Sequence, residues 1–166
     1  MISRREFMAG SFAIVVASNA SRKPAPEPES VLVNDIHSQL NPTRVLGISQ
    51  PRSLEDVQGL VRAARKDGKV ISVAGGRHAM GGQQFGADTL LLDIRKLNRV
   101  LQLDRKNGIL EVEAGIEWPE LIAGYLNLQN GDGPAWGIAQ KQTGADRFTL
   151  AGTIAASANS QGGPPL

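Results

Sequence analysis

Apolar side chains recur at helical spacing in the stretch that follows Pro51. They fall on one face of a helix at Leu54, Val57, Leu60, Val61 and Ala64. Ser53 can cap the start of this helix, and Asp56 three residues later completes a variant of the capping box. Gly68 supplies the stop. The pattern therefore predicts one amphipathic helix between Ser53 and Gly68.

Strand-like runs flank this helix on both sides. Residues 44–48 form a short apolar segment before it, and residues 70–74 form a continuous apolar run after it. A continuous run is typical of a strand that is buried on both faces. The three segments predict a β-α-β unit that ends at a glycine-rich loop.

The second half of the chain begins with three further short strands, at 89–94, 99–103 and 109–113. Asn107-Gly108 is a strong hairpin signal between the last two. Pro119 opens a second helix, whose buried side we expect to be Leu121, Ile122, Tyr125 and Leu126. Small apolar residues at 149–158 predict a tightly packed third helix. The order indicates an α+β fold, with mostly antiparallel strands after the β-α-β unit.

The first twenty residues have the pattern of an export signal. Ser-Arg-Arg-Glu-Phe-Met at 3–8 leads into an apolar run at 7–17, and small residues follow. The paired arginines indicate the twin-arginine route, which predicts a periplasmic protein. The run is shorter than the ~20 residues that span a bilayer. We expect an export signal at 1–20, a proline-rich linker at 21–33 and one domain at 34–166. The alternative is a disordered basic tail with an accidental apolar run.

Composition excludes several classes of function. A formal charge of +2 gives no electrostatic case for binding nucleic acid or an anionic membrane. The chain has no cysteine, so disulfides, thiolate metal sites and cysteine nucleophiles are ruled out. With only two histidines, we expect no metal site.

Chemistry concentrates in the loop after the second strand, which reads AGGRHAMGGQQF at 74–85. Successive glycines let the backbone approach a ligand and leave N–H groups free for a pyrophosphate. The loop matches neither the dinucleotide fingerprint GxGxxG nor the P-loop pattern. A tight connection within a packed domain is the other interpretation of the glycines.

Several motifs in order carry a family resemblance. The pattern P-x-S-x-E-D-V at 51–57, a strand, and Gly-Gly-x-His-x-x-x-Gly at 75–82 resemble the FAD-binding domain of the vanillyl-alcohol oxidase / p-cresol methylhydroxylase (PCMH) family. Residues 91–98, 112–118 and 142–153 are similar to its later segments. The resemblance runs from about residue 34 to 162 and implies the family's α+β PCMH-type FAD-binding domain, incomplete at its C-terminus.

The resemblance also implies which residues contact FAD. In the first segment these are Gly75, Gly76, Arg77, His78, Ala79, Met80, Gly81 and Gln83, and in the second Gly144, Asp146, Thr149, Gly152 and Thr153. His78 stands where many members attach the flavin covalently, through an imidazole nitrogen to the 8α-methyl carbon; the alternative is a hydrogen-bonded histidine beside non-covalent FAD. Ala79 departs from the serine common at its position, and Gln161 from a frequent histidine.

The implied activity is oxidation of an alcohol, polyol, sugar lactone or similar small molecule by hydride transfer to flavin. Oxygen or another acceptor would then reoxidise the flavin. No residue stands out as a catalytic base, so the catalytic residues stay unassigned. We expect the substrate domain in a missing C-terminal part, or on a separate chain. Two alternatives stay open: a non-catalytic flavin-binding remnant or docking module, and a domain for another phosphate-bearing ligand.

Four residues outside the two segments receive structural interpretations. His37 is far from the glycine-rich loop in sequence and is expected to be structural or exposed. Trp118 and Trp136 are expected to anchor the core or a loop. Glu111 alternates with apolar neighbours and is expected on a solvated face.

Overall fold

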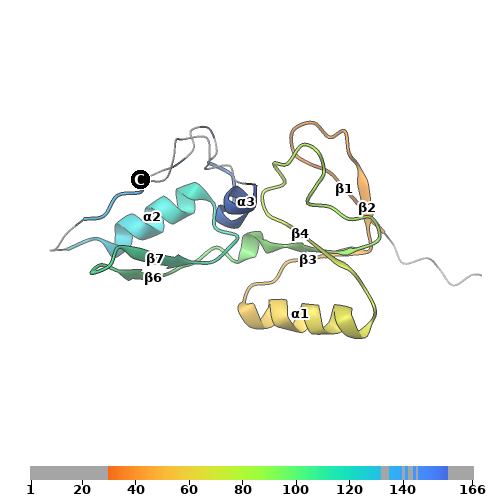
Figure 1. Ribbon diagram of the computed structural model, residues 1–166, viewed down its shortest axis with the longest axis horizontal. Coiled ribbons are helices and arrows are strands. Elements are labelled where there is room, and N and C mark those ends of the chain that lie inside the picture. The colour runs from red at the N-terminus through yellow and green to blue at the C-terminus, as the bar shows by residue number, and fades with distance from the viewer. Residues whose placement is uncertain (1–29, 132–134, 140, 142–143, 145, 157–166) are drawn as a thin grey trace, which may run out of the picture.

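The computed structural model describes residues 30–131, 135–139, 141, 144 and 146–156. The predicted export signal and most of the predicted linker lie outside these residues, as does the C-terminal end. Figure 1 shows two lobes side by side, with helix α3 (Leu150–Ala155) at their junction. We call residues 30–93 the first lobe and the described residues from 94 to 156 the second lobe.

The first lobe is built on a three-stranded parallel sheet. Strands β3 (Gly47–Ser49) and β4 (Ile71–Ala74) both pair in parallel with the central strand β5 (Leu90–Asp93). Helix α1 (Leu54–Lys66) connects β3 to β4, which confirms the predicted β-α-β unit. A hairpin-like pair, β1 (Val31–Val33) and β2 (Thr43–Val45), is antiparallel.

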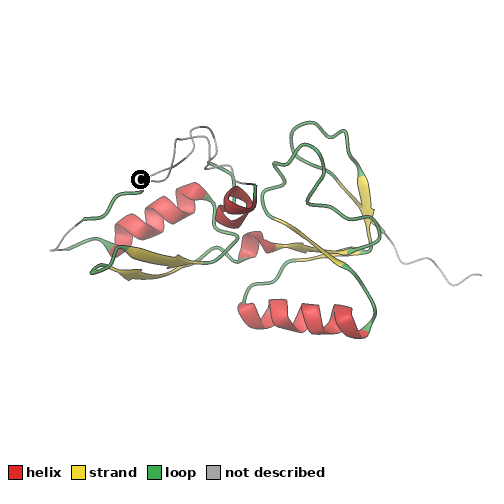
Figure 2. Cartoon of the chain, in the orientation of Figure 1, coloured by secondary structure: helices red, strands yellow, loops and turns green. Residues whose placement is uncertain are grey.

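The later strands are mostly antiparallel, as predicted, because β6 (Val100–Asp104) and β7 (Ile109–Val112) pair antiparallel, but β5 is an exception. Strand β5 is parallel to both neighbours, because the long segment 75–89 carries the chain back to the start of the sheet. Parallel pairing needs a connection of about a dozen residues or more, and this loop supplies it without a helix. The glycine-rich segment, which we call the glycine loop (residues 75–86), is therefore the crossover itself (Figure 2).

Helix α1 begins as predicted, with Ser53 Oγ accepting a hydrogen bond from the Asp56 N–H at 3.1 Å. Its apolar face is covered less than expected: Ala64 is buried, but Leu54 is 64% exposed and Val61 46% exposed. A sheet of three short strands is too narrow to cover the whole face.

The apolar run at 70–74 predicted a strand that is buried on both faces, but strand β4 is partly exposed. It lies at the edge of the sheet, and Val73 is 51% exposed. The central position belongs to β5, where Leu91 and Leu92 are both buried. Periodicity alone does not tell a central strand from an edge strand.

In the second lobe, helix α2 (Trp118–Leu128) packs on a hairpin of β6 (Val100–Asp104) and β7 (Ile109–Val112). A short 3-10 helix, η1 (Ile94–Lys96), leads into it from β5. Leu121 and Tyr125 are buried as predicted, but Leu126 is 53% exposed, so the buried side of α2 is narrower than expected.

Each lobe has its own apolar core. Val33, Val45, Ala74 and Leu91 form the first, with Phe85 packed against them. Ile116, Trp118 and Leu121 form the second, with Val100, Leu110, Val112, Phe148 and Leu150 around them. Because β1 contributes Val33 to the first core, the predicted linker boundary at residue 33 is too late. The ordered domain includes Val31–Val33.

Candidate functional site

A cavity of about 590 Å³ lies where the two lobes meet. The first lobe contributes the end of β4 and the glycine loop, and the second contributes α3 with the residues on either side of it. Its lining residues are Val73, Gly75, Gly76, Arg77, His78, Ala79, Gln83, Gln84, Phe148, Thr149, Gly152, Ala155 and Ala156. This volume is in the range of small-molecule sites.

The cavity joins most of the residues predicted from the two sequence segments. Gly75, Gly76, Arg77, His78, Ala79, Gln83, Thr149 and Gly152 line it. Met80, Gly81, Gly144, Asp146 and Thr153 do not.

Two of the residues outside the lining have clear structural roles. Thr153 is fully buried, and its hydroxyl donates to the Thr149 carbonyl at 3.0 Å. Asp146 forms an ion pair with Lys141 at 2.5 Å.

Close packing explains the first two glycines of the loop. A Cβ on Gly75 would collide with Thr149 Oγ1, and a Cβ on Gly76 would lie 2.7 Å from the Arg147 carbonyl oxygen. These glycines let two segments of the protein approach each other. For these two glycines, the structure supports the second interpretation of the sequence, a tight connection within a packed domain.

Unused backbone donors remain in the loop. Within the described part of the chain, the N–H groups of residues 76–80 donate no hydrogen bond to another residue. Arg77 has a positive φ of 60°, a conformation that turns neighbouring N–H groups toward one side. Successive free N–H groups form the kind of concave donor set that binds phosphate oxygens.

A buried carboxylate anchors Arg77 beside this donor set. Asp93 is fully buried and accepts hydrogen bonds from Arg95 at 2.6 and 2.9 Å and from Arg77 at 3.4 Å. Burial alone would raise the pKa of Asp93, but the bonds from Arg95 and Gln50 outweigh it and lower the pKa. Two guanidinium groups share one carboxylate, which leaves positive charge close to the loop. That charge favours an anionic ligand.

Three described residues have buried side-chain polar atoms that lack a partner. Trp118 Nε1 belongs to the second core, whereas the Nε of Arg77 and both polar atoms of the Gln84 amide belong to residues that line the cavity. Such orphaned groups are rare in native proteins and often mark a binding site. Together with the free N–H groups, the atoms of Arg77 and Gln84 fit a large polar ligand that offers hydrogen-bond donors and acceptors. The sequence singled out Gln83, and its neighbour Gln84 was missed.

His78 is held through both of its ring nitrogens. Its Nε2 lies 2.9 Å from the Arg147 carbonyl oxygen, and its Nδ1 lies 2.9 Å from Nε2 of His37. The ring also packs against Phe148, with centroids 4.3 Å apart. His37 is exposed, as expected, but it contacts the glycine loop, which its distance in sequence had not indicated.

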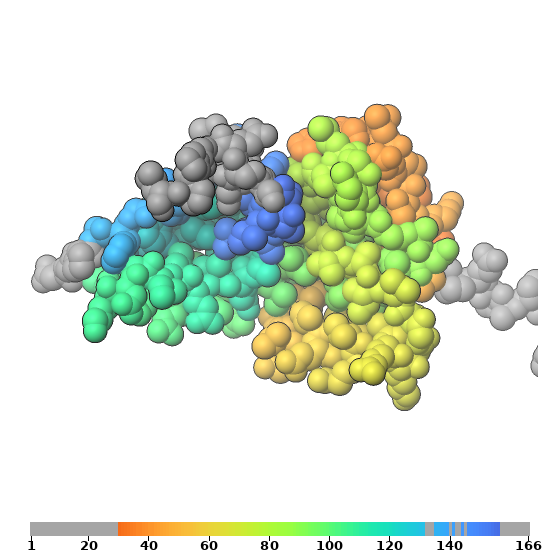
Figure 3. Space-filling view, viewed as in Figure 1, coloured from red at the N-terminus to blue at the C-terminus, as the bar shows by residue number. Residues whose placement is uncertain are grey.

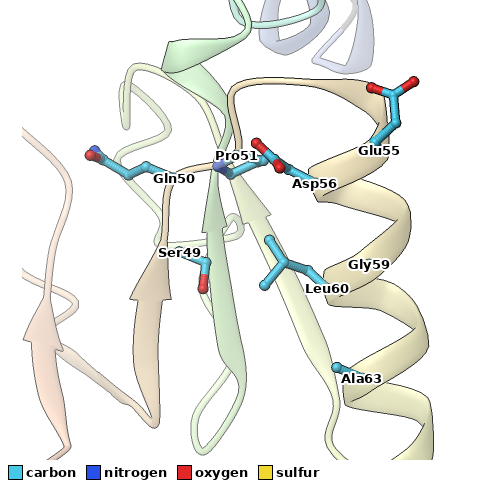
Figure 4. Close-up of a pocket in the computed structure, with 8 residues that line it drawn as sticks. All are labelled: Ser49, Gln50, Pro51, Glu55, Asp56, Gly59, Leu60 and Ala63. Carbon is cyan, nitrogen blue, oxygen red and sulfur yellow. The ribbon is translucent and has the colours of Figure 1, made fainter.

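A second cavity, of about 610 Å³, lies between the end of β3 and helix α1 (Figure 4). Ser49, Gln50, Pro51, Glu55, Asp56, Gly59, Leu60 and Ala63 line it. It holds none of the predicted site residues and no orphaned buried group of the described chain. The space-filling view shows that the described surface at the lobe junction is formed by the glycine loop and α3 together (Figure 3). The junction cavity is thus the stronger candidate.

The described residues add two negative findings. They contain no cluster of three or more potential metal ligands. They also contain no helix with the length and apolar character needed to cross a bilayer.

Comparison with known proteins agrees with the geometry. The family described as "FAD binding domain" matches residues 45–160. L-gulonolactone oxidase of Mus musculus is 36% identical over 67 residues, which are 40% of this chain and 15% of that protein. The FAD-linked oxidoreductase aurO of Gibberella zeae is 28% identical over 106 residues, covering 64% of this chain and 20% of its own length.

A solved structure supports the same conclusion at the level of the fold. Alkyldihydroxyacetonephosphate synthase superposes with a TM-score of 0.57 at 28% identity, over 65% of this chain and 21% of that one. The chain thus spans no more than about a fifth of the relatives named here. The family match at residues 45–160 covers the glycine loop, the described lining of the junction cavity and both cores, apart from Val33 of the first core. The α+β fold and the predicted resemblance are confirmed, and this chain belongs to the FAD-binding domain family of flavin-dependent oxidoreductases, whose cofactor is FAD.

Proposed function

We propose that this chain is the FAD-binding part of an oxidoreductase that takes hydride from a small molecule bearing a C–OH or similar C–H group. The substrate class would be an alcohol, a polyol or a sugar lactone, and oxygen or another acceptor would reoxidise the flavin. The observation that carries the proposal is the junction cavity, whose lining combines Gly76, Arg77, His78 and Ala79, with their free N–H groups, and Gln84, whose buried amide lacks a partner. The match to an L-gulonolactone oxidase favours a lactone or a polyol.

The chain's own residues would bind and orient the cofactor. The N–H groups of residues 76–79 and the charge of Arg77 suit the pyrophosphate, while Val73 and Phe148 offer apolar contacts to a ring system. FAD would supply the hydride acceptor. Because the chain spans about a fifth of its curated relatives, we place the catalytic base and the substrate pocket in polypeptide outside this domain.

We further propose that His78 attaches the flavin covalently. A neutral imidazole is a competent nucleophile, and His78 lines the cavity. The new bond joins a ring nitrogen to the 8α carbon, which loses one C–H bond. His78 would supply the nucleophilic nitrogen and give up its proton to solvent, while FAD would supply the 8α carbon and take up the two electrons, which dioxygen would then accept to give hydrogen peroxide.

The visible absorption spectrum of the purified chain with added FAD tests both proposals. Bound flavin gives a yellow protein, and colour that stays with the pellet after acid precipitation shows a covalent link. His78→Ala should then release the colour into the supernatant. Met80→Ala is the matched control, because Met80 lies in the same loop, is exposed and does not line the cavity.

Each other outcome selects an alternative. Colour in the wild-type supernatant would keep FAD binding and reject the histidyl link. A folded protein without flavin absorbance would favour a site for another phosphate-bearing ligand. Flavin binding without turnover, when the chain is joined to the remaining polypeptide, would favour a non-catalytic remnant or docking module.

We also propose export through the twin-arginine route, on the basis of the Ser3–Met8 pattern. The test is the location of the protein in cells after Arg4 and Arg5 are both replaced by lysine. Periplasmic protein that disappears with this double change supports the route. Unchanged location rejects it.

A further inference from the structure

Forty-one positions separate His37 from His78, yet their rings are in contact. His37 Nε2 lies 2.9 Å from His78 Nδ1, and the ring centroids are 5.0 Å apart. His78 Nε2 is 2.9 Å from the Arg147 carbonyl oxygen. His78 therefore has one partner from each lobe.

The Arg147 contact sets the direction of the hydrogen bond between the two histidines. A carbonyl oxygen only accepts, so His78 Nε2 carries the proton. A neutral ring has one N–H, which leaves the lone pair of His78 on Nδ1. The Nε2–H of His37 must then donate to it. A second proton on His78 would bring two N–H groups face to face, unless His37 gave up its own Nε2 proton.

The backbone around His37 is built to keep this contact. Asp35 is buried, and its carboxylate accepts from the N–H groups of His37 at 2.8 Å and Ser38 at 2.6 Å. The Ile36 N–H donates to the Arg77 carbonyl at 3.1 Å, which ties this turn directly to the glycine loop. His37 is exposed but its backbone is held on both sides, so its position is set by the fold.

The charges around His78 come from three elements. Burial lowers its pKa below the ordinary value, the Arg147 carbonyl and Glu117 at the start of α2 oppose this, and His37 adds to the lowering. Glu117 is itself paired with the Arg147 guanidinium at 3.3 Å. His37 is thus the neighbouring titratable group that disfavours a proton on His78.

We propose that His37 is a positioning residue for His78: it donates to Nδ1, fixes the plane of the ring and disfavours a second proton there, so that the loop presents a neutral, oriented imidazole to the flavin. This inference rests on the proposed covalent link at His78. For the link to form, His37 would release Nδ1, and the Nδ1 lone pair of His78 would bond to the 8α carbon that FAD supplies. The electron and proton balance is that given above for the link.

A titration of the full chain by NMR tests the inference without any flavin. The chain has two histidines, so single substitutions assign both signals. In His37→Leu, we expect His78 to take up its proton at a higher pH than in the wild type, because a donor and a like charge are removed. An unchanged titration of His78 would overturn the inference.

The rate of covalent attachment is the second readout. Protein and FAD are mixed at about pH 8, where His78 is neutral, then quenched with acid, and flavin fluorescence is measured on the protein. We expect His37→Leu to slow attachment at least about tenfold, because the ring is no longer held in line. His37→Gln should restore most of the rate, since its amide can donate to Nδ1. The positioning role of His37 would be contradicted if His37→Gln and His37→Leu slowed covalent attachment equally, or if His37→Leu did not slow it.

Asn41→Ala is the matched control. Asn41 Nδ2 donates to the Met80 carbonyl at 2.8 Å, so it ties the same two loops without touching His78. It should leave the titration of His78 unchanged; a shift as large as that of His37→Leu would mean that loop attachment alone controls His78. If His78→Ala still bound flavin covalently, the proposed link would fail, and the NMR titration would still decide the role of His37.

Discussion

The two lobes are stabilised in different ways. The first lobe buries small aliphatic side chains and two carboxylates, Asp35 and Asp93, and leaves much of the apolar face of α1 exposed. The second lobe packs aliphatic side chains and Phe148 around Trp118, and its helix α2 contacts strand β6 of the hairpin. Polar bonding thus shapes the lobe that carries the glycine loop, while apolar packing holds the lobe that supports it.

This difference matters for the cavity because neither lobe forms it alone. The first lobe supplies the free N–H groups and His78, whereas the second supplies Phe148, Thr149 and the Arg147 carbonyl. A ligand at the junction would depend on both kinds of stabilisation. Changes that weaken one lobe show whether the two lobes unfold together.

The largest effect is expected from the two cores. Trp118→Ala should lower the free energy of unfolding by about 3–5 kcal/mol, and Leu91→Ala in the first lobe by about 2–5 kcal/mol. Denaturant titrations followed by circular dichroism measure both. If the lobes form one cooperative unit, each variant moves a single transition. Two transitions, with Trp118→Ala moving only one, would show that the lobes are independent.

The next largest effect is expected from Asp93→Ala. It should lower the free energy of unfolding by about 2 kcal/mol, because Arg77 and Arg95 lose the carboxylate that pairs with both. It should also weaken FAD binding, since Arg77 is no longer held at the loop. Fluorescence quenching of FAD on titration with protein gives that affinity. The surface pair Asp67–Lys69 offers the control: Asp67→Ala should change neither quantity by a measurable amount.

A glycine in each long helix sharpens the comparison. Gly124→Ala in α2 would place a Cβ 2.6 Å from Val100 Cγ2. We expect this variant to lower the free energy of unfolding by about 1–3 kcal/mol. A Cβ on Gly59 in α1 would have no neighbour within 4 Å, so Gly59→Ala should raise the free energy of unfolding by about 0.5–1 kcal/mol. Thermal melts of the two variants should therefore move in opposite directions. Destabilisation by both would mean that α1 is covered after all.

The last prediction concerns the dependence of stability on acid pH. Burial would raise the pKa of Asp35, but bonds from the Ser38 side chain and from the N–H groups of His37, Ser38 and Gln39 lower it to about 2, against 3.8 when unfolded. Its stabilisation is complete above pH 3.8 and is lost as the pH falls through about 2. The Asp35→Asn variant should be less stable than the wild type near neutral pH. As the pH falls between these two values, the variant should lose less of its stability than the wild type does. Urea titrations across this range measure it, and parallel curves for both proteins would contradict it.

Local signals in the sequence were sufficient for the helices and for the β-α-β unit. Ser53 and Pro119 mark helix starts by their own chemistry, so their prediction needed no knowledge of distant residues. The direction of β5 and the exposure of Val73 depend on which strand takes the centre of the sheet. That choice is made by tertiary packing, and the apolar run does not encode it.

The site divides in the same way. The glycine loop and the residues around Thr149 could be predicted, because each is a contiguous motif. His37 and Phe148 could not, because their roles follow from contacts with His78 across long separations in sequence. Gln84 differs again, since only its lack of a partner among the described residues sets it apart from Gln83.

The junction has a consequence for protein engineering. Every cavity residue lies either before η1 or after α2, so a cut between η1 and β6 would place one wall of the cavity on each fragment. If only the two fragments together bind the ligand, the free energy of ligand binding also stabilises the association of the fragments. The domain is therefore suited to fragment complementation. The absorption spectrum of bound flavin would report that two separately expressed fragments have associated.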